Sequence, residues 1–257
     1  MGRTIAVVNQ KGGVGKTTTA INLAAAISAS EQKVLLVDFD PQGNASTGFG
    51  VDKEDGLATI YNFLAGSSTM QECVQTITPT WLSIIPASSD LAGAEVELVN
   101  EKEREFFLKR ALATIQEDYD LIILDCPPSL GLLTLNCLVA ADSIVVPLQC
   151  EFLAMEGLSQ LLKTVDIVKK KLNPELTIEG VVLTMFSQGE GQNNQVAMEV
   201  RSHMGEGVFK TVIPRRFEVS ESPSYGKPVV WYDPWSQASW AYFNLAHELL
   251  IRKKKDS

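Results

Sequence analysis

Histidine and paired cysteines are scarce in this sequence, and their scarcity narrows the chemistry it can perform. The chain has 257 residues but only 2 histidines, so a Cys–His hydrolase is poorly supported. Its 4 cysteines include no Cys-x-x-Cys pair, which argues against a zinc site and against a disulfide framework. They form no compact iron–sulfur ligand set either, although a cluster shared between two subunits would need no such spacing. We therefore expect a reduced, cytosolic protein.

Long hydrophobic runs and positive charge are also lacking. No apolar stretch approaches the about 18 residues of a membrane-spanning helix, and the N-terminal residues MGRTIAVVNQKGG contain no signal peptide. Lys and Arg number 22 against 31 Asp and Glu, which gives a net charge of −9. Residues 1–128 hold 17 of these acidic residues and only 9 of the basic ones. Binding to nucleic acid or to an anionic membrane would need a local basic patch, and the second half is the better place for one.

The sequence does contain a repeated alternation of short apolar runs and longer helical patterns. The runs are continuous, as in strands that are covered on both faces. The predicted strands are Ile5–Asn9, Val34–Asp38, Leu82–Pro86, Leu121–Leu124, Ser143–Pro147, Gly180–Met185 and Thr211–Ile213. The predicted helices are Thr17–Ser28, Glu101–Ile115, Leu132–Ala140, Glu156–Lys171, Asn194–His203 and Ser236–Ile251. This order predicts one α/β domain over residues 1–251, a doubly wound and mostly parallel sheet flanked by helices, with a basic tail at 252–257.

A glycine-rich loop joins the first predicted strand to the first predicted helix. Residues 10–19 are QKGGVGKTTT, in which GKT matches the end of the phosphate-loop pattern GxxxxGK[ST], while Gln10 replaces the leading glycine. Glycines let backbone N–H groups turn inward around phosphate oxygens, and the helix N-terminus adds its positive end. We expect Lys16 to reach the β- and γ-phosphates and the Thr17 hydroxyl to ligate Mg²⁺. The expected nucleotide-binding residues are Gly12, Gly13, Val14, Gly15, Lys16, Thr17 and Thr18.

A plain glycine turn is the alternative interpretation of this loop. The strand before it, the helix after it and the GKT triplet together favour a site for ATP and Mg²⁺.

Carboxylates follow two of the predicted strands. Asp38 and Asp40 lie at the end of Val34–Asp38, and Asp125 follows the four apolar residues Leu121–Leu124 in the Walker B layout. The carboxyl ends of parallel strands border the crevice where ligands bind. Asp125 would therefore hold Mg²⁺ through water, because Mg²⁺ takes few protein ligands. The structural alternative for Asp38 and Asp40 is a capped Asp-Pro-Gln-Gly turn.

These motifs resemble one family closely, the ParA/Soj partition ATPases with a deviant Walker A loop. The resemblance includes KGGVGKTTT at 11–19, DFDPQGN at 38–44 and DCPPSLG at 125–131, and it continues through LAGAEVELV, QCEFLAMEGLSQLL, GVVLTM, VFKTVIPR and SPSYGKPV. It implies that Lys11 reaches the nucleotide of a partner subunit and that Asp40 orients or activates the attacking water. It also implies that Asp38 supports the Mg²⁺ shell. A solvated loop charge is the alternative for Lys11.

The same resemblance suggests further contacts with the nucleotide. Pro214 and Arg216 would line the adenine pocket with Met185 beside them, and Glu151 would touch the ribose of the partner's nucleotide. Core packing is the alternative for Met185, because methionine commonly fills gaps in a core.

Members of this family are cytosolic ATPases that form a homodimer around ATP. The dimer binds duplex DNA non-specifically, a ParB-type protein activates hydrolysis, and the cycle partitions chromosomes or plasmids. No helix-turn-helix segment precedes Ile5, so the chain resembles the short, chromosomal-type members.

Two positions depart from the family pattern. Gly189 and Glu218 stand where the family has arginines of its DNA-binding surface, and Arg216 stands in place of an asparagine. Non-specific DNA binding depends mainly on phosphate neutralisation, so these changes lower the expected affinity. Basic residues that would rebuild a patch are Arg201, Arg215, Arg216, Lys227, Lys169–Lys171 and Lys253–Lys255.

The departures leave two alternative functions open. The first is a nucleotide-switched, cargo-positioning ATPase with weak or no DNA binding. The second is a MinD-like membrane ATPase that uses the helix at Ser236–Ile251, whose Trp240, Phe243, Ala246 and Leu250 are spaced for one face. Core packing of that helix is the better interpretation, so we do not expect a membrane partner.

Overall fold

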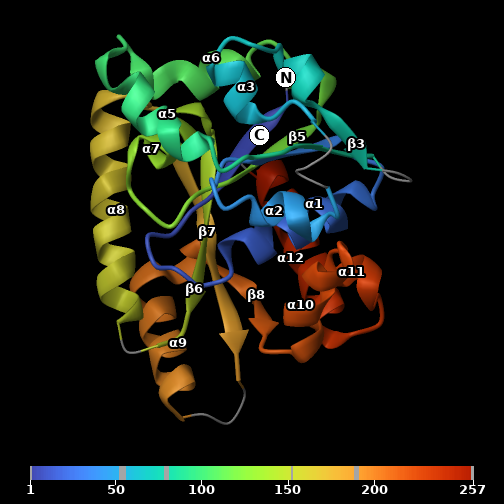
Figure 1. The fold of residues 1–257 in the computed structure, drawn as a ribbon. Coiled ribbons are helices and arrows are strands. Elements are labelled where there is room, and N and C mark those ends of the chain that lie inside the picture. Colours follow the sequence, from blue (N-terminus) through green and yellow to red (C-terminus); the bar gives the residue numbers. More distant parts are fainter. Residues whose placement is uncertain (1, 52–55, 78–80, 152, 188–190, 256–257) are drawn as a thin grey trace.

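The computed structural model describes residues 2–51, 56–77, 81–151, 153–187 and 191–255, and for residues 192 and 253–255 it describes the backbone alone. Its strands form an eight-stranded sheet in the order β3-β4-β2-β5-β1-β6-β7-β8 (Figure 1). Neighbouring strands run parallel, except that β3 pairs antiparallel with β4. The strands are β1 (Arg3–Val7), β2 (Val34–Asp38), β3 (Gln75–Ile77), β4 (Leu82–Ile85), β5 (Leu121–Asp125), β6 (Ser143–Gln149), β7 (Thr177–Phe186) and β8 (Val208–Pro214). The predicted fold class is confirmed.

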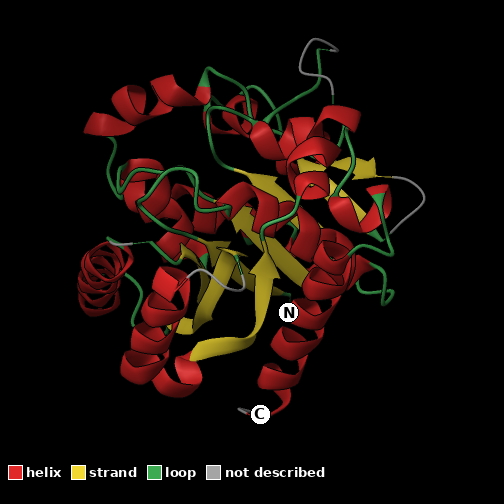
Figure 2. Cartoon of the chain, turned by 90° about the horizontal axis from the view of Figure 1, so that it is seen from below, coloured by secondary structure: helices red, strands yellow, loops and turns green. Residues whose placement is uncertain are grey.

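Helices cover both faces of the sheet, as Figures 1 and 2 show. Residues of α1 and α12 form the hydrophobic core on one face, and residues of α7, α8 and α9 contribute to the core on the other. The α-helices are α1 (Lys16–Ser28), α2 (Asn44–Gly48), α3 (Ile60–Leu64), α4 (Met70–Cys73), α5 (Leu91–Glu97), α6 (Phe107–Leu112), α7 (Leu132–Ala140), α8 (Ala154–Lys171), α9 (Gly191–Met204), α10 (Phe217–Glu221), α11 (Val229–Tyr232) and α12 (Gln237–Lys255). Cover on both faces explains the continuous apolar runs, because β2 and β5 are buried at every residue.

The strand order places one crevice at the centre of the sheet. β1 lies between β5 and β6; the chain leaves β1 towards β2 in one half of the sheet and leaves β6 towards β7 in the other. Such a reversal opens a crevice beyond the carboxyl ends of the central strands. The register puts Asp38 of β2 directly opposite Asp125 of β5, and Val7 of β1 opposite the same Asp125. The glycine loop and the carboxylates therefore meet at one edge.

Several parts of the secondary structure differ from the sequence prediction, which did not include the short helices α2 to α5, α10 and α11. β3 was not predicted, because a three-residue edge strand with no fully buried position has little apolar pattern. The helix predicted over Glu101–Ile115 is wrong in length: these residues form a 3₁₀ turn at Arg104–Phe106 followed by the short α6. Glu103 adopts a left-handed φ of 53°, which interrupts a continuous helix at its start.

The last helix packs into the core, as the sequence favoured. Its buried side chains include Ala238, Tyr242, Leu245, Ala246 and Leu249, whereas Trp240 is 53% exposed. α12 contacts α1 and β8. Among the described residues, no helix is long and apolar enough to cross a membrane.

The backbone of α12 continues to Lys255, past the helix end predicted at Ile251. Arg252 donates to the carbonyl oxygens of Glu179 and Val208 at 2.8 and 3.0 Å. At least residues 252–255 of the predicted tail therefore extend the helix, while residues 256 and 257 lie outside the described part of the chain.

A carboxylate from α12 compensates for an irregularity in the edge strand β8. The register of β8 against β7 shifts along its length. Lys210 and Thr211 donate their backbone N–H groups to the Glu248 carboxylate at 2.8 and 3.0 Å, and the Thr211 hydroxyl donates at 2.9 Å. Burial alone would raise the pKa of Glu248, but these hydrogen bonds and the nearby Arg252 lower it below its usual value.

We predict that Glu248→Ala lowers the free energy of unfolding by about 1–3 kcal/mol, because it leaves two backbone donors without an acceptor. The lowered pKa means that the charged carboxylate stabilises the fold fully at pH 7 and less as the pH falls below about 4. Urea unfolding at pH 7 and at a pH below about 4 measures the free energy of unfolding of both forms. The control is Glu206→Ala, at an exposed position. An equal loss in both variants would contradict the prediction.

Candidate nucleotide and metal site

The glycine loop between β1 and α1 is fastened to two other strands. Asn9 donates its side-chain amide to the Pro147 carbonyl at 2.8 Å and accepts the backbone N–H of Lys11 at 3.0 Å. The Thr184 hydroxyl donates to the Val14 carbonyl at 2.8 Å. Gly15 adopts a φ of 85°, a left-handed conformation that glycine takes without strain. The loop is therefore held in a fixed curve before any ligand binds.

Lys16 is buried at the base of this loop. It is 6% exposed, and its ammonium donates to the Lys11 carbonyl at 3.0 Å. Burial lowers the pKa of Lys16, while the nearby Asp125 and Asp40 act in the opposite direction. An ammonium in this position has anionic groups close to it and gains from a further anion such as a phosphate.

Asp38 and Asp125 lie fully buried on the neighbouring strands. Asp38 accepts the backbone N–H and the hydroxyl of Ser46 at 2.8 and 2.7 Å. Burial raises the pKa of Asp38 to about 6, although the Ser46 hydrogen bonds lower it. Burial and the charge of Asp38 raise the pKa of Asp125 well above its usual value, and Thr17 lowers it only in part.

Asp125 is the residue whose surroundings best fit a bound cation. Among the described residues, neither of its buried carboxylate oxygens has a hydrogen-bond partner of good geometry. Within the same part of the chain, no group of three or more His, Cys, Asp or Glu residues converges to cage a metal. Mg²⁺ suits this arrangement, because it keeps several waters and binds substrate phosphates with only one or two carboxylates.

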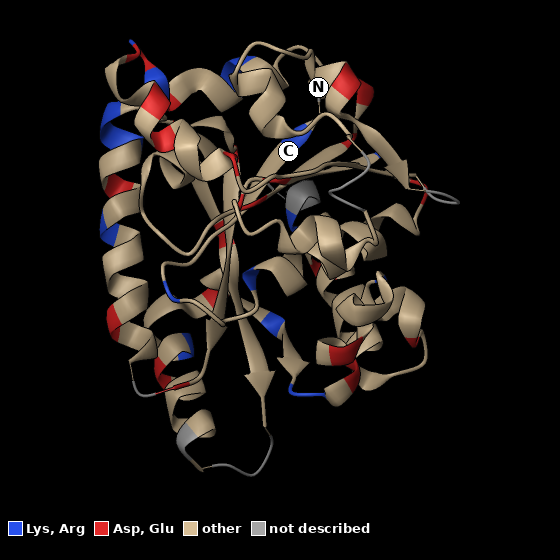
Figure 3. Ribbon diagram, in the orientation of Figure 1, with Lys and Arg blue, Asp and Glu red and all other residues tan. Residues whose placement is uncertain are grey.

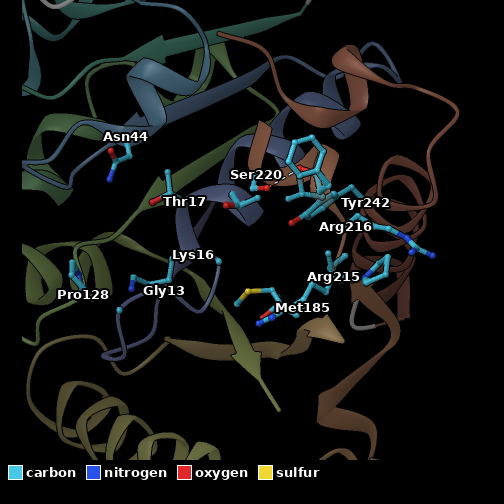
Figure 4. A pocket seen from close by; sticks show the side chains of 18 of the residues that line it. Gly13, Lys16, Thr17, Asn44, Pro128, Met185, Arg215, Arg216, Ser220 and Tyr242 are labelled. Atoms are coloured by element: carbon cyan, nitrogen blue, oxygen red, sulfur yellow. Dashed lines mark hydrogen bonds between the residues drawn. The ribbon is translucent and has the colours of Figure 1, made fainter. Parts of the chain in front are cut away.

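A cavity of about 610 Å³ extends from the glycine loop to β8 and α10 (Figure 4). It is lined by Gly12, Gly13, Gly15, Lys16, Thr17, Thr18, Asp40, Gln42, Asn44, Pro128, Thr184, Met185, Ile213, Pro214, Arg215, Arg216, Phe217, Val219, Ser220 and Tyr242. This volume suits a ligand of nucleotide size. Most of the predicted nucleotide-binding residues thus meet in one cavity. Asp40, 6% exposed, faces it from the end of β2.

Several predicted residues lie outside this cavity lining. Val14 is buried beneath the loop. Asp38 and Asp125 lie behind the cavity at the strand ends, while Lys11 and Glu151 pair with each other on its outer side, 2.6 Å apart. The contact of Glu151 with a partner's ribose stays a prediction.

The cavity lining contains Met185, Pro214 and Arg216, which the sequence predicted beside the adenine, and also residues that the sequence did not assign to the nucleotide. Met185 has a left-handed φ of 49° at the end of β7, and it lines the cavity with Pro214 and Arg216 rather than packing wholly in the core. Tyr242 of α12 and Asn44 of α2 also line it. Asn44 belongs to the DFDPQGN segment and was within reach of sequence analysis, whereas Tyr242 was hidden within a helix expected only to pack.

The positions that replace the family's DNA-binding arginines are only partly described. Glu218 is partly exposed on α10, directly after the exposed Arg215 and Arg216. Lys227 is exposed, and Arg201 donates to the Lys210 carbonyl at 3.4 Å. Gly189 and the side chains of residues 253–255 lie outside the described residues.

The cysteines contribute no chemistry at this site. Cys126 follows Asp125 and is fully buried, and burial raises the pKa of its thiol well above the usual value. A buried thiol with a raised pKa is a poor nucleophile, which agrees with its interpretation as a small core residue.

The sheet is mostly parallel, a glycine loop follows its first strand, and a lysine and a threonine begin the next helix. The neighbouring strand β5 ends in an aspartate. These features define a P-loop nucleotide-binding protein. A family model described as an AAA domain matches residues 2–178. The chromosome partitioning protein ParA of Myxococcus xanthus (strain DK1622) is 51% identical over 252 residues, which cover 98% of this chain and 89% of that protein. The sporulation initiation inhibitor protein Soj of Bacillus subtilis (strain 168) is 51% identical over 249 residues, 97% of this chain and 98% of that protein.

Solved structures share the fold of this chain. A protein of Mycobacterium smegmatis described as cobyrinic acid a,c-diamide synthase, with bound ADP and magnesium, aligns with a TM-score of 0.87 at 36% identity, covering 100% of this chain and 97% of that one. The cell division ATPase MinD of Pyrococcus furiosus aligns with a TM-score of 0.81 at 28% identity, over 98% of this chain and 99% of that one. The chain belongs to the ParA/Soj family of P-loop ATPases.

We predict that Asp125→Asn stabilises the nucleotide-free protein at neutral pH, because it removes an unpaired buried charge beside Asp38. The raised pKa keeps the proton on the folded state to a higher pH than on the unfolded chain, so the carboxylate weakens the fold as pH rises above about 4. We expect the melting temperature to rise by about 2–4 °C per kcal/mol of relief at pH 7.5, and by little near pH 4.

The control for this prediction is Asp120→Asn, at a carboxylate that lies before β5 and accepts the backbone N–H of Lys33. Thermal unfolding of both variants without nucleotide is the measurement. A lower melting temperature for Asp125→Asn at pH 7.5 would contradict the role assigned to its charge.

Proposed function

We propose that the protein is a slow ATPase that dimerises around ATP and Mg²⁺, binds duplex DNA non-specifically and partitions chromosomes or plasmids with a ParB-type activator. The observation that carries the proposal is the cavity in which the glycine loop, Lys16 and Asp40 meet in front of Asp125, whose carboxylate has no hydrogen-bond partner among the described residues. The relatives named as chromosome partitioning and Soj proteins, and the related structure with ADP and magnesium, support it.

Each group in the cavity has a role in this proposal. Backbone N–H groups of the loop and the N-terminus of α1 bind the phosphates, and Lys16 neutralises the β- and γ-phosphates. Thr17 and Asp125, supported by Asp38, hold Mg²⁺, which neutralises charge on the phosphate oxygens. Asp40 orients the attacking water. Lys11 reaches the nucleotide of the partner subunit, which links dimerisation to ATP.

The adenine end of the cavity is assigned to β7 and β8. Met185, Pro214 and Arg216 line it and offer an apolar wall and a guanidinium to a planar base. The preformed curve of the loop, anchored at Asn9 and Thr184, supports phosphate binding without rearrangement.

We expect Asp40→Ala to lower ATP turnover by at least about 100-fold, because a group that positions water or takes its proton contributes about that much. ATP binding and the dimer should survive, because the loop and Lys16 are unchanged. Phosphate release and sedimentation velocity with ATP and Mg²⁺ measure the two properties. A monomeric Asp40→Ala protein under these conditions would refute the assignment.

Gly12→Val and Lys11→Ala are the matching variants that should bind ATP as monomers. Among the described residues, no atom lies within 4 Å of the Cβ that a side chain on Gly12 would add. The valine variant should therefore fold normally and keep some ATP binding, while its bulk should block the approach of a second subunit. An ATP-dependent dimer of either variant would count against the sandwich arrangement.

A second function is favoured by the charge of α10. Figure 3 shows acidic positions within α10 next to the basic segment that ends β8. Glu218 repels phosphate where the family has an arginine, so the dimer would position a protein cargo with weak or no DNA binding. An ATP dimer that ignores DNA even at low salt would favour this function over partitioning along DNA.

We predict that Glu218→Arg strengthens ATP-dependent binding to non-specific duplex DNA. One added phosphate contact per subunit should steepen the slope of log K against log salt by about 2 for a dimer. Fluorescence anisotropy with ATP, ADP and no nucleotide across a salt series measures it. Glu117→Arg, an exposed position before β5, makes the same charge change away from α10, and equal gains in both variants would contradict a DNA surface at α10.

A further inference from the structure

Lys11 is held by an ion pair within its own subunit. Its ammonium lies 2.6 Å from a carboxylate oxygen of Glu151, and the two side chains are 42% and 47% exposed. Lys11 belongs to the loop after β1, and Glu151 lies between β6 and α8. The pair therefore joins the phosphate loop to the segment that begins α8.

A second contact joins the same two segments. The side-chain amide of Gln10 donates to the Gly157 carbonyl at 3.2 Å and to the Gln160 side chain at 2.8 Å, both within α8. The two residues that precede the glycines thus turn towards α8, and neither lines the nucleotide cavity. Lys16 lies on the cavity side, where its ammonium bonds to the Lys11 carbonyl.

We propose that Glu151 is a positioning residue that holds the Lys11 ammonium in its own subunit, and that the ATP-bound dimer forms when Lys11 leaves Glu151 for the partner's nucleotide. This inference rests on the ATP-sandwich dimer proposed above. One ammonium cannot hold its short bond to Glu151 and also reach across a dimer interface, so the two contacts compete. A dimer with two-fold symmetry breaks two such pairs.

The exposure of the pair sets its strength. An exposed ion pair contributes little free energy because solvent screens it. Lys11 is therefore held by Glu151 only weakly and is able to leave it. A nucleotide with several phosphate charges offers the ammonium a stronger partner than one carboxylate. Glu151 therefore weakens dimerisation, because its ion pair with Lys11 must break first. In the single subunit the same pair neutralises the charge of the Lys11 ammonium.

The test compares Glu151→Gln with Glu156→Gln in the Asp40→Ala background, with ATP and Mg²⁺, by sedimentation velocity over a concentration series. Glutamine at 151 has nearly the shape of glutamate but cannot hold the ammonium as an ion pair. We expect the dimer dissociation constant to fall by about 2- to 30-fold, from two weak pairs per dimer. The gain should shrink as salt rises. Glu156 lies on α8, and its carboxylate accepts from Gln160 rather than from Lys11, so its glutamine variant keeps the Lys11–Glu151 pair and should leave the constant unchanged.

The outcomes separate this inference from the proposed function. An unchanged or weaker dimer for Glu151→Gln, beside a normal dimer of the Asp40→Ala parent, refutes the holding role alone and favours a contact of Glu151 with the partner. Equal gains in both glutamine variants also refute it, because charge alone would then explain them. Monomers of the parent and of both variants refute the sandwich dimer and this inference together. Unchanged melting temperatures show that the variants are folded.

Discussion

Two buried carboxylates lie side by side at the centre of the site and set the electrostatics of the groups around them. The β2–β5 register sets Asp38 opposite Asp125, and both are fully buried. Like charges in such surroundings resist ionisation, and only Asp38 receives good hydrogen bonds, from Ser46. The fold therefore holds a charge that a cation would relieve, directly in front of the phosphate loop.

The phosphate loop after β1 is held in place by contacts with several parts of the fold. Asn9 fastens it to β6, Thr184 fastens it to β7, and the buried Lys16 fills its base. Because these contacts come from strands on one side of the reversal point, the same topology that opens the crevice also shapes the loop. Lys11 departs from this pattern, since it faces Glu151 outside the cavity.

One short segment links the interior of the site to the outer surface. Residues 214–216 end β8 and line the cavity, and α10 with Glu218 follows at once. A nucleotide in the cavity beside Pro214 and Arg216 would therefore lie next to α10, where the resemblance to the family predicts a DNA-binding surface. Glu218 stands where the family pattern has an arginine, and it lies outside the cavity lining. Its charge would therefore affect what binds at α10 without changing the wall of the nucleotide cavity.

The sequence by itself determined the sheet class, the phosphate loop and the three aspartates, because strand-ending carboxylates and a glycine loop are local patterns. It missed β3 and the break at Glu103, where short edges and a left-handed residue leave no periodic signal. Three features follow from tertiary contacts alone: Asp125 has no hydrogen-bond partner among the described residues, Met185 and Tyr242 line the cavity, and Lys11 pairs with Glu151. Those facts depend on strand register and on how distant elements pack, which no local pattern encodes.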